Sequence, residues 1–254
     1  MLTAVNRVSK NKATLTGLDR DRKYIAFDGV DGAAGAGNSL KLGTGPFTLN
    51  AWIRRTHNQN GVVYNLFKDY NNYVYFGWNT SNQIQFYAKI GAGVFDANLS
   101  TSNLSTNYRY LYEQVFHMIT VTSDRAGNNE IYLNGIPLLN SGICNASDFN
   151  CGTTNVYFGT RLATFNAIDV SEFSAYNTAL SPTDIKRIYN GGKSFNHLKW
   201  EYKGNCHTWY RFGDFKYDNY QTILNACMNE PDFSDSEGGA LGTSNITTDD
   251  IHGK

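Results

Sequence analysis

The sequence is poor in charge. Asp, Glu, Lys and Arg make up 17% of its 254 residues, and the 22 basic and 22 acidic residues cancel to a formal net charge of zero. A protein that binds nucleic acid mainly through phosphates carries a basic excess, so we expect no nucleic-acid partner. No apolar run approaches the roughly 20 residues that span a bilayer, so we expect no membrane insertion.

The N-terminus lacks the apolar core of a secretory signal. We therefore expect a protein that is made in the cytoplasm and does not leave the cell by that route. Cysteine is scarce as well, with four members: Cys144, Cys151, Cys206 and Cys227. Their spacing matches no zinc module. A disulfide between Cys144 and Cys151 is sterically conceivable, but reduced thiols are the interpretation that suits a cytoplasmic product.

Aromatic residues are abundant, at 14% of the chain, with 17 Tyr and 15 Phe. Tyr, Phe and Thr favour the pleated, half-buried surface of a strand, and Gly and Asn supply turns. The segment 47–54 alternates apolar and polar residues, which predicts a strand with one face in the core, and 33–38 predicts a flexible loop. Strands are predicted over 24–27, 47–54, 73–78, 83–88, 116–122, 130–134, 136–138, 156–159, 167–174 and 208–212.

One short helix is predicted over 181–190. Ser181 suits its N-cap, Pro182 its first position and Asp184 the third, where a carboxylate faces the helix dipole. Many short strands, one helix and no alternation of strands with helices predict an all-β fold, an antiparallel jelly-roll sandwich.

The chain divides into three predicted parts. These are an N-terminal arm over 1–22, a single domain over 23–229 and a polar, acidic tail over 230–254. The arm and the tail lack the pattern to fold alone, so we expect them to order against a partner and to serve as docking elements.

The hairpin over 73–88 yields the most specific structural prediction. Val74, Phe76 and Trp78 share one parity, and so do Ile84, Phe86 and Ala88. Both apolar sets reach one face only if the connecting loop has an odd number of residues, which a loop over 80–82 provides. The opposite face then carries these residues: Tyr73, Tyr75, Asn79, Gln83, Gln85 and Tyr87.

That polar face is the predicted binding surface. Sugars present apolar ring faces that stack on aromatic side chains, and hydroxyls that pair with amides and carboxylates. With the loop 69–72 and the run 107–112, the candidate ligand-binding residues are Tyr70, Asn72, Tyr73, Tyr75, Gln83, Gln85, Tyr87, Tyr108 and Tyr110. Tyr and Arg also anchor protein interfaces, so the sequence alone leaves glycan and protein partners open.

Calcium is a candidate cofactor. It takes several oxygen ligands, and Asp28, Asp31 and Asp169 are the acidic residues expected near one rim of a sandwich. An Asx turn, in which Asp28 caps its own backbone, is the interpretation we prefer, because no loop is dense in ligands.

Four segments resemble the motifs of laminin-G-like and concanavalin A-like jelly rolls. They are 24–31, 47–53, the pair 116–122 and 130–135, and 168–192, in that family's order. The resemblance covers about residues 24–192 and implies a recognition module.

The same superfamily contains glycoside hydrolases that place acidic residues at alternate positions of one strand. The corresponding strand here begins at Ala167, where the nucleophile would stand, and Asp169 and Glu172 follow it. A retaining mechanism requires both carboxylates, so we predict no catalytic residue and no enzyme. The five histidines are scattered, and His117 is expected to be structural.

Residues 208–214, with 222–224, are similar to an extension on structural proteins of tailed phages. This resemblance implies a virion surface protein, such as a capsid decoration or a head or tail fibre component. Its expected partners are other virion proteins and cell-surface glycans, and we expect a homo-oligomer. The alternatives are a free lectin-like carbohydrate-binding protein and, as a minor one, a glycoside hydrolase.

Overall fold

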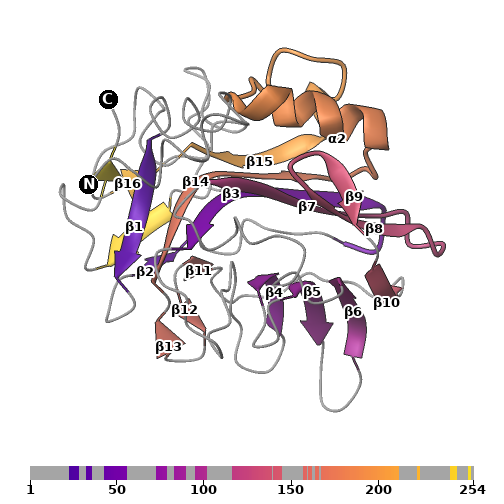
Figure 1. Cartoon of the computed structure of the whole chain (residues 1–254), viewed down its shortest axis with the longest axis horizontal. Helices are drawn as coiled ribbons and strands as arrows, with labels where there is room; N and C mark the ends of the chain where they lie inside the picture. The colour runs from indigo at the N-terminus through magenta and orange to yellow at the C-terminus, as the bar shows by residue number, and fades with distance from the viewer. Residues whose placement is uncertain are drawn as a thin grey trace, which may run out of the picture.

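The computed structural model describes residues 23–28, 33–35, 43–55, 73–78, 83–89, 95–101, 116–138, 140–144, 157–158, 160–161, 164–165, 167–211, 222–223, 241–244 and 251–252. These residues form antiparallel sheets, a short α-helix and two 3-10 turns (Figure 1). The predicted all-β sandwich with a short helix is confirmed. Within this described part, no helix is long and apolar enough to cross a membrane.

The main sheet has eight strands. Seven follow the order β18-β1-β14-β3-β7-β8-β9, and β15 pairs with β14 beside this path. Spatial neighbours such as β3 and β14 are far apart in sequence, as the crossovers of a jelly roll require. The bounds are β1 (Tyr24–Asp28), β3 (Phe47–Arg55), β7 (His117–Ser123), β8 (Asn129–Leu133), β9 (Ile136–Leu138), β14 (Ala167–Tyr176), β15 (Cys206–Tyr210) and β18 (Ile251–His252).

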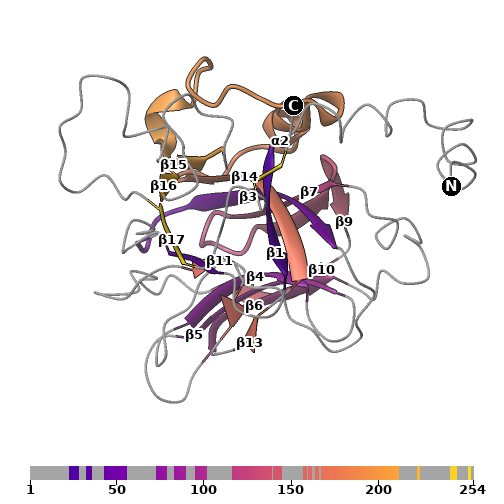
Figure 2. The same ribbon diagram turned by 90° about the vertical axis from the view of Figure 1, so that its left-hand side faces the viewer.

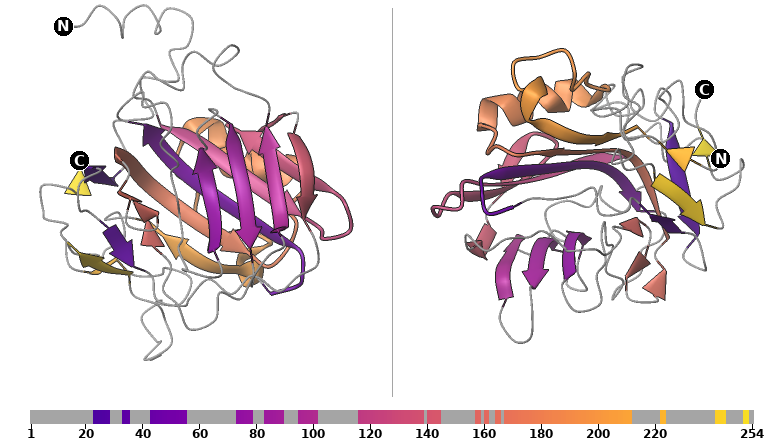
Figure 3. Two further views of the ribbon diagram at one scale, coloured as in Figure 1. Left: turned by 90° about the horizontal axis from the view of Figure 1, so that it is seen from below. Right: turned by 180° about the vertical axis from the view of Figure 1, so that it is seen from behind.

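A second sheet lies against one face of the main sheet (Figures 2 and 3). Its order is β10-β6-β5-β4, with β4 (Tyr73–Trp78), β5 (Ile84–Lys89), β6 (Phe95–Thr101) and β10 (Asn140–Cys144). The sequence interpretation missed β6 and β10. Two smaller sheets contain β2 (Ala33–Gly35), β11 (Tyr157–Phe158), β16 (Thr222–Ile223) and β17 (Leu241–Ser244), and β12 (Thr160–Arg161) with β13 (Thr164–Phe165).

Some segments pair without a local strand signal. Ala33–Gly35 was predicted as loop, and that prediction is wrong, because β2 pairs with both β11 and β17. Within the predicted tail, β17 pairs with β2, and β18 pairs with β1 through Ile25 and Ile251. The predicted arm over 1–22 lies outside the described residues.

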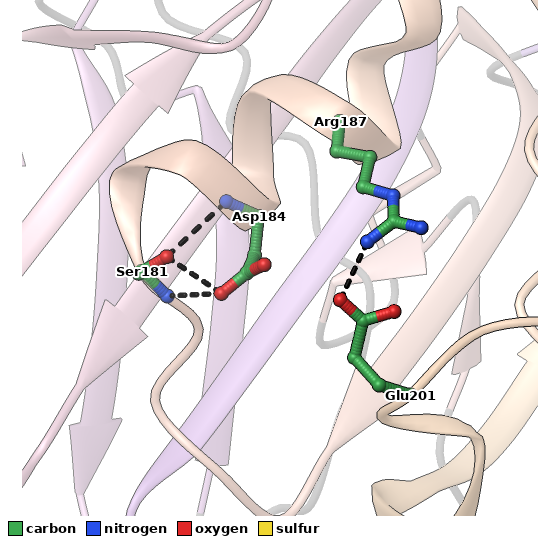
Figure 4. Close-up of polar contacts among 4 residues, drawn as sticks. All are labelled: Ser181, Asp184, Arg187 and Glu201. Carbon is green, nitrogen blue, oxygen red and sulfur yellow. Dashed lines mark hydrogen bonds and ion pairs between the residues drawn. The ribbon is translucent and has the colours of Figure 1, made fainter.

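Helix α2 (Pro182–Tyr189) covers the other face of the main sheet (Figure 1). It begins as the sequence predicts, because Ser181 Oγ accepts the Asp184 N–H at 3.2 Å and the Asp184 carboxylate accepts from Ser181 in return (Figure 4). Asn190 ends the helix in the left-handed conformation, with φ 49°. Its buried residues Ile185 and Ile188 belong to an aromatic-rich core cluster on this side of the sheet.

Alternate residues of β3 therefore face two different layers. Phe47 contacts Phe86 of the second sheet with ring centroids 5.1 Å apart, and Trp52 stacks on Tyr189 of α2 at 5.7 Å. The prediction of one core face for 47–54 is wrong, because the layer built by α2 and the segment after it buries the second face.

The polar residues on this second face are fully buried and hydrogen-bonded. Thr48 Oγ1 donates to the Thr178 carbonyl at 2.8 Å, and Asn50 Oδ1 accepts from Thr120 Oγ1 at 2.8 Å. Each bond offsets the desolvation that burial imposes on a hydroxyl or amide. A sequence pattern of alternating polarity therefore does not reveal that this face is covered.

Candidate ligand-binding site

The predicted hairpin register is confirmed. Phe76 pairs with Phe86, and Trp78 pairs with Ile84. This is the register that a three-residue loop over 80–82 requires, although residues 79–82 lie outside the described part. Phe76, Ile84 and Phe86 are fully buried, so the apolar parity of the hairpin faces the main sheet.

The opposite parity carries half-exposed polar side chains. Gln83, Gln85 and Tyr87 are partly exposed, whereas Ile84 and Phe86 between them are fully buried. Because successive side chains of a strand point to opposite faces, these three point away from the core. We call this side of the sheet β10-β6-β5-β4 the outer face; it presents two amides and a phenol.

Polar positions extend from the hairpin across the outer face. Tyr87 pairs with Tyr75 on β4 and with Asn98 on β6, and Gln85 pairs with Ser100 on β6. Neighbouring strands lie about 4.8 Å apart, so the three strands span roughly 10 Å. This width matches a sugar ring with its hydroxyls, which amides and phenols recognise.

Sequence reasoning missed the contribution of β6. The segment 95–101 alternates Phe95 and Leu99 with Asn98 and Ser100, so the period-2 rule used for the other strands would have found it. Tyr73 and Tyr75 lie on β4 as predicted, but their side chains are outside the described part. Four predicted residues also lie outside it: Tyr70, Asn72, Tyr108 and Tyr110.

The predicted calcium ligands are partly described. Asp28 pairs with Ala167 and Asp169 with Ala26, so the two acidic residues lie on neighbouring strands, as expected. The side chain of Asp28 and the whole of Asp31 are outside the described part. Within that part, no group of three His, Cys, Asp or Glu residues could hold a metal ion. The calcium site stays a prediction.

Arg54 binds the Asp169 carboxylate in this structure. Arg54 Nε donates to Asp169 Oδ2 at 2.6 Å, and the carboxylate side chain is 2% exposed. The guanidinium also lies 4.6 Å from the ring centre of Tyr24 and 4.8 Å from that of Phe116. Burial is the largest single influence on the pKa of Arg54 and would lower it, but the charge and hydrogen bond of Asp169, together with Tyr24, outweigh burial and raise that pKa.

Glu172, the other acidic residue of β14, is covered as well. It is 4% exposed, and Ser194 Oγ donates to its Oε1. A retaining hydrolase needs two carboxylates that face the substrate together. Here Asp169 serves the ion pair with Arg54 and Glu172 holds the segment after α2, so both act structurally.

Two of the described histidines, His117 and His197, are buried and hydrogen-bonded. His117 is 6% exposed, and its Nδ1 lies 3.0 Å from Asn134 Nδ2, which confirms the expectation for this residue. His197 is completely buried and hydrogen-bonds through Nδ1 to the Tyr176 hydroxyl. Burial, and secondarily the charge of Arg211, lower the pKa of His197 to about 3.

Cys206 is buried outside any disulfide, and its Sγ donates to the Thr208 carbonyl at 3.5 Å. The side chains of Cys144, Cys151 and Cys227 lie outside the described part, so a disulfide between Cys144 and Cys151 stays undecided.

Residues 28–186, more than half of the chain, match the family model of the concanavalin A-like lectin/glucanases superfamily. The chain belongs to this family. The matched segment begins at the end of β1 and ends inside α2, so it contains β3, β7, β8, β9 and β14 of the main sheet and all four strands of the second sheet.

Two curated relatives are clostridial toxins. Botulinum neurotoxin type F from Clostridium botulinum is 24% identical over 199 residues, which cover 72% of this chain and 15% of the toxin. Type E from Clostridium butyricum is 23% identical over 171 residues, which cover 60% of this chain and 13% of the toxin. The chain thus spans a small part of these relatives, and their activities as whole toxins do not transfer to it.

Among solved structures, a protein from Bacteroides ovatus that was proposed to bind carbohydrate has a TM-score of 0.50 and 14% identity, covering 90% of this chain and 59% of that one. The binding domain of Paraclostridial Mosquitocidal Protein 1 has a TM-score of 0.47 and 18% identity, covering 61% of this chain and 38% of that one. At these identities the Bacteroides ovatus protein shows a shared fold.

Proposed function

We propose that this chain is a non-catalytic carbohydrate-recognition module that binds glycan on its outer face. The observation that carries the proposal is the partly exposed set of Gln83, Gln85 and Tyr87, which alternates with the fully buried Ile84 and Phe86 along and just before β5. Membership of a family of lectins and glucanases supports it. The structural roles of Asp169 and Glu172 favour recognition over hydrolysis.

The chemistry of the outer face suits sugar hydroxyls. Each Gln amide offers a carbonyl acceptor and two N–H donors, which pair with neighbouring hydroxyls, and the Tyr87 ring offers an apolar surface for a C–H face. A shallow, open surface of this kind binds a single sugar weakly. Linked copies raise the overall avidity by supplying several sites at once, which is what a homo-oligomer would provide.

A glycan array with the intact chain, in calcium and then in chelator, tests the proposal. We expect binding that Tyr87→Ala and Gln85→Ala each weaken about fivefold to twentyfold, the equivalent of about 1 to 2 kcal/mol. Lys199→Ala, at an exposed position in the segment after α2, is the control and should bind as the parent chain does.

Two results would count against the proposal in different ways. Absence of all array signal, with and without calcium, would defeat glycan binding by the outer face. Strong array binding that neither Tyr87→Ala nor Gln85→Ala weakens would show that the glycan binds to another surface of the chain.

We propose further that the module acts in adhesion on the surface of a virion, together with other virion proteins and as a homo-oligomer. The similarity of residues 208–214 to a phage extension supports this; part of that segment is in β15, which pairs with β14. Light scattering on the purified chain tests the oligomer, and mass spectrometry of purified particles tests the location. A monomer that is absent from particles would overturn this part of the proposal.

A further inference from the structure

Residues of α2 and of the turn between β8 and β9 line a groove. Figure 1 shows these two elements on the opposite side of the main sheet from the second sheet. The volume of the groove is about 490 Å³, inside the roughly 300–1,000 Å³ of small-molecule sites. The residues that matter for its chemistry are Ile136, Pro137, Pro182, Thr183, Lys186 and Tyr189.

The walls of the groove are apolar and held in place. Ile136 is 62% exposed, which makes it the exposed large hydrophobic residue of the described part. Pro137 and Pro182 have no side-chain rotamers to lose, and the Tyr189 ring is fixed by its stacking on Trp52. A ligand that binds here loses little affinity to the ordering of side chains.

The turn packs directly on the helix, so the groove is preformed. Gly135 has φ +75°, and a Cβ at this position would lie 3.1 Å from Tyr189 Cβ and 3.2 Å from Lys186 Cα. Glycine therefore permits the close approach that sets the distance between the two walls.

The groove carries one uncompensated charge. Lys186 is its charged lining residue and makes no ion pair among the described residues. The charged neighbours on α2 are engaged elsewhere: Arg187 pairs with Glu201 at 2.5 Å, and Asp184 binds Ser181 (Figure 4). An ammonium group beside apolar walls favours a ligand that brings an anion and an apolar face together.

We propose that this groove is a second sugar subsite, specific for a uronic acid residue of an acidic glycan. A pyranose that carries a carboxylate matches all three features: the carboxylate pairs with Lys186, the hydroxyls reach Thr183, and the C–H face covers Ile136. The proposal rests on the proposed carbohydrate recognition and adds to it a location and a charge specificity that the outer face does not have.

Labelled lysines test the groove directly. Reductive methylation with labelled formaldehyde keeps the charge of each lysine and adds a methyl signal visible by NMR. The intact chain is titrated with methyl glucuronide and methyl galacturonide at millimolar concentrations, and with the matching neutral glucoside and galactoside. The Lys186 signal is identified by its loss in Lys186→Gln.

We expect a uronide to shift the Lys186 signal, the neutral glycosides to leave it in place, and added salt to weaken the effect. Ile136→Thr should weaken the affinity about threefold to fivefold through lost apolar contact. Lys199→Gln is the matched control and should leave the Lys186 response unchanged.

If neither uronide shifts the NMR signal of Lys186, the proposed uronic acid site is wrong. An equal shift of every lysine signal would also overturn the proposal, because it indicates unspecific charge attraction. Tyr87→Ala separates the two proposals, because it should weaken outer-face binding and preserve the Lys186 response. A silent glycan array with a responsive Lys186 would defeat the outer face alone.

Discussion

Replacing Asp169 by Asn removes the carboxylate that neutralises Arg54 between β14 and β3. The two residues are register partners, joined by the 2.6 Å Nε–Oδ2 contact. The Asp169 side chain is 2% exposed and that of Arg54 18% exposed, so water cannot replace the lost partner fully. The variant therefore leaves a guanidinium charge largely buried and without its counter-ion.

The magnitude follows from the burial of each partner. Removal of one partner from a fully buried ion pair costs about 3 to 5 kcal/mol. Arg54 keeps some contact with solvent and its contacts with the rings of Tyr24 and Phe116, so we expect Asp169→Asn to lower the free energy of unfolding by about 2 to 3 kcal/mol. Arg54→Met leaves the more deeply buried Asp169 carboxylate without its counter-ion and should lower the free energy of unfolding by about 3 to 4 kcal/mol.

The double variant distinguishes pairing from general damage. With both charges gone, no unpaired ion remains, so the double variant should lose less than the sum of the two single variants, by about 2 kcal/mol. Urea unfolding of the four chains, followed by tryptophan fluorescence at neutral pH, measures this difference.

The exposed pair Arg187–Glu201 is the control, because its side chains are 51% and 54% exposed. Glu201→Gln should cost less than about 1 kcal/mol. If Asp169→Asn costs no more than this control, or if the double-variant cycle is additive, burial does not set the strength of the Arg54–Asp169 pair and the reasoning fails.

Three further predictions concern stability. Burial lowers the pKa of His197 to about 3 and that of His207 to about 4, from an ordinary value of 6.5. As the pH falls, both histidines therefore take up protons in the unfolded chain before they do so in the folded chain. The free energy of unfolding should thus decrease as the pH drops from about 6.5 towards 4. The loss should reach about 1 to 2 kcal/mol per histidine near pH 5, and a flat profile of unfolding free energy in that range would refute it. Ser181→Ala removes the side-chain half of the α2 capping box, while the backbone N–H of residue 181 still donates to the Asp184 carboxylate; it should cost about 1 kcal/mol in urea unfolding, whereas an unchanged midpoint would show that the Ser181 hydroxyl is dispensable. Gly135→Ala should cost about 2 to 4 kcal/mol, more than Gly191→Ala, which has a similar φ but open space around it; equal losses would mean that close packing on α2 is unimportant.

The sequence predicted the hairpin because its information is local. Buried and partly exposed side chains alternate along the hairpin, with Phe76 and Phe86 buried and Gln85 and Tyr87 partly exposed. A loop with an odd number of residues then aligns the two strands. The cap of α2 was predictable for the same reason, since Ser181 and Asp184 are three residues apart. Strand β6 obeys the same rule, because Phe95, Ala97 and Leu99 alternate with polar residues.

The covered second face of the main sheet could not be predicted in this way. Thr48 and Asn50 read as solvent-facing positions, yet both are fully buried, because α2 and the segment after it fold back over β3. The role of Asp169 has the same origin: its partner Arg54 is 115 residues earlier in the chain, and only strand order brings them together. Long-range pairing of this kind leaves no periodic signal in either segment.

This covering layer also decides where ligands can bind. Because both faces of β3, β7 and β14 are buried, the two recognition surfaces proposed for the described part lie outside them, on opposite sides of the main sheet: the outer face of the second sheet and the groove beside α2 (Figures 1 and 2). Tyr87 and Lys186 therefore lie on opposite sides of the main sheet, and substitutions at the two should have additive effects on binding. A short glycan cannot reach both sites on one chain, so any avidity between them requires either a long acidic polymer or a second copy of the module.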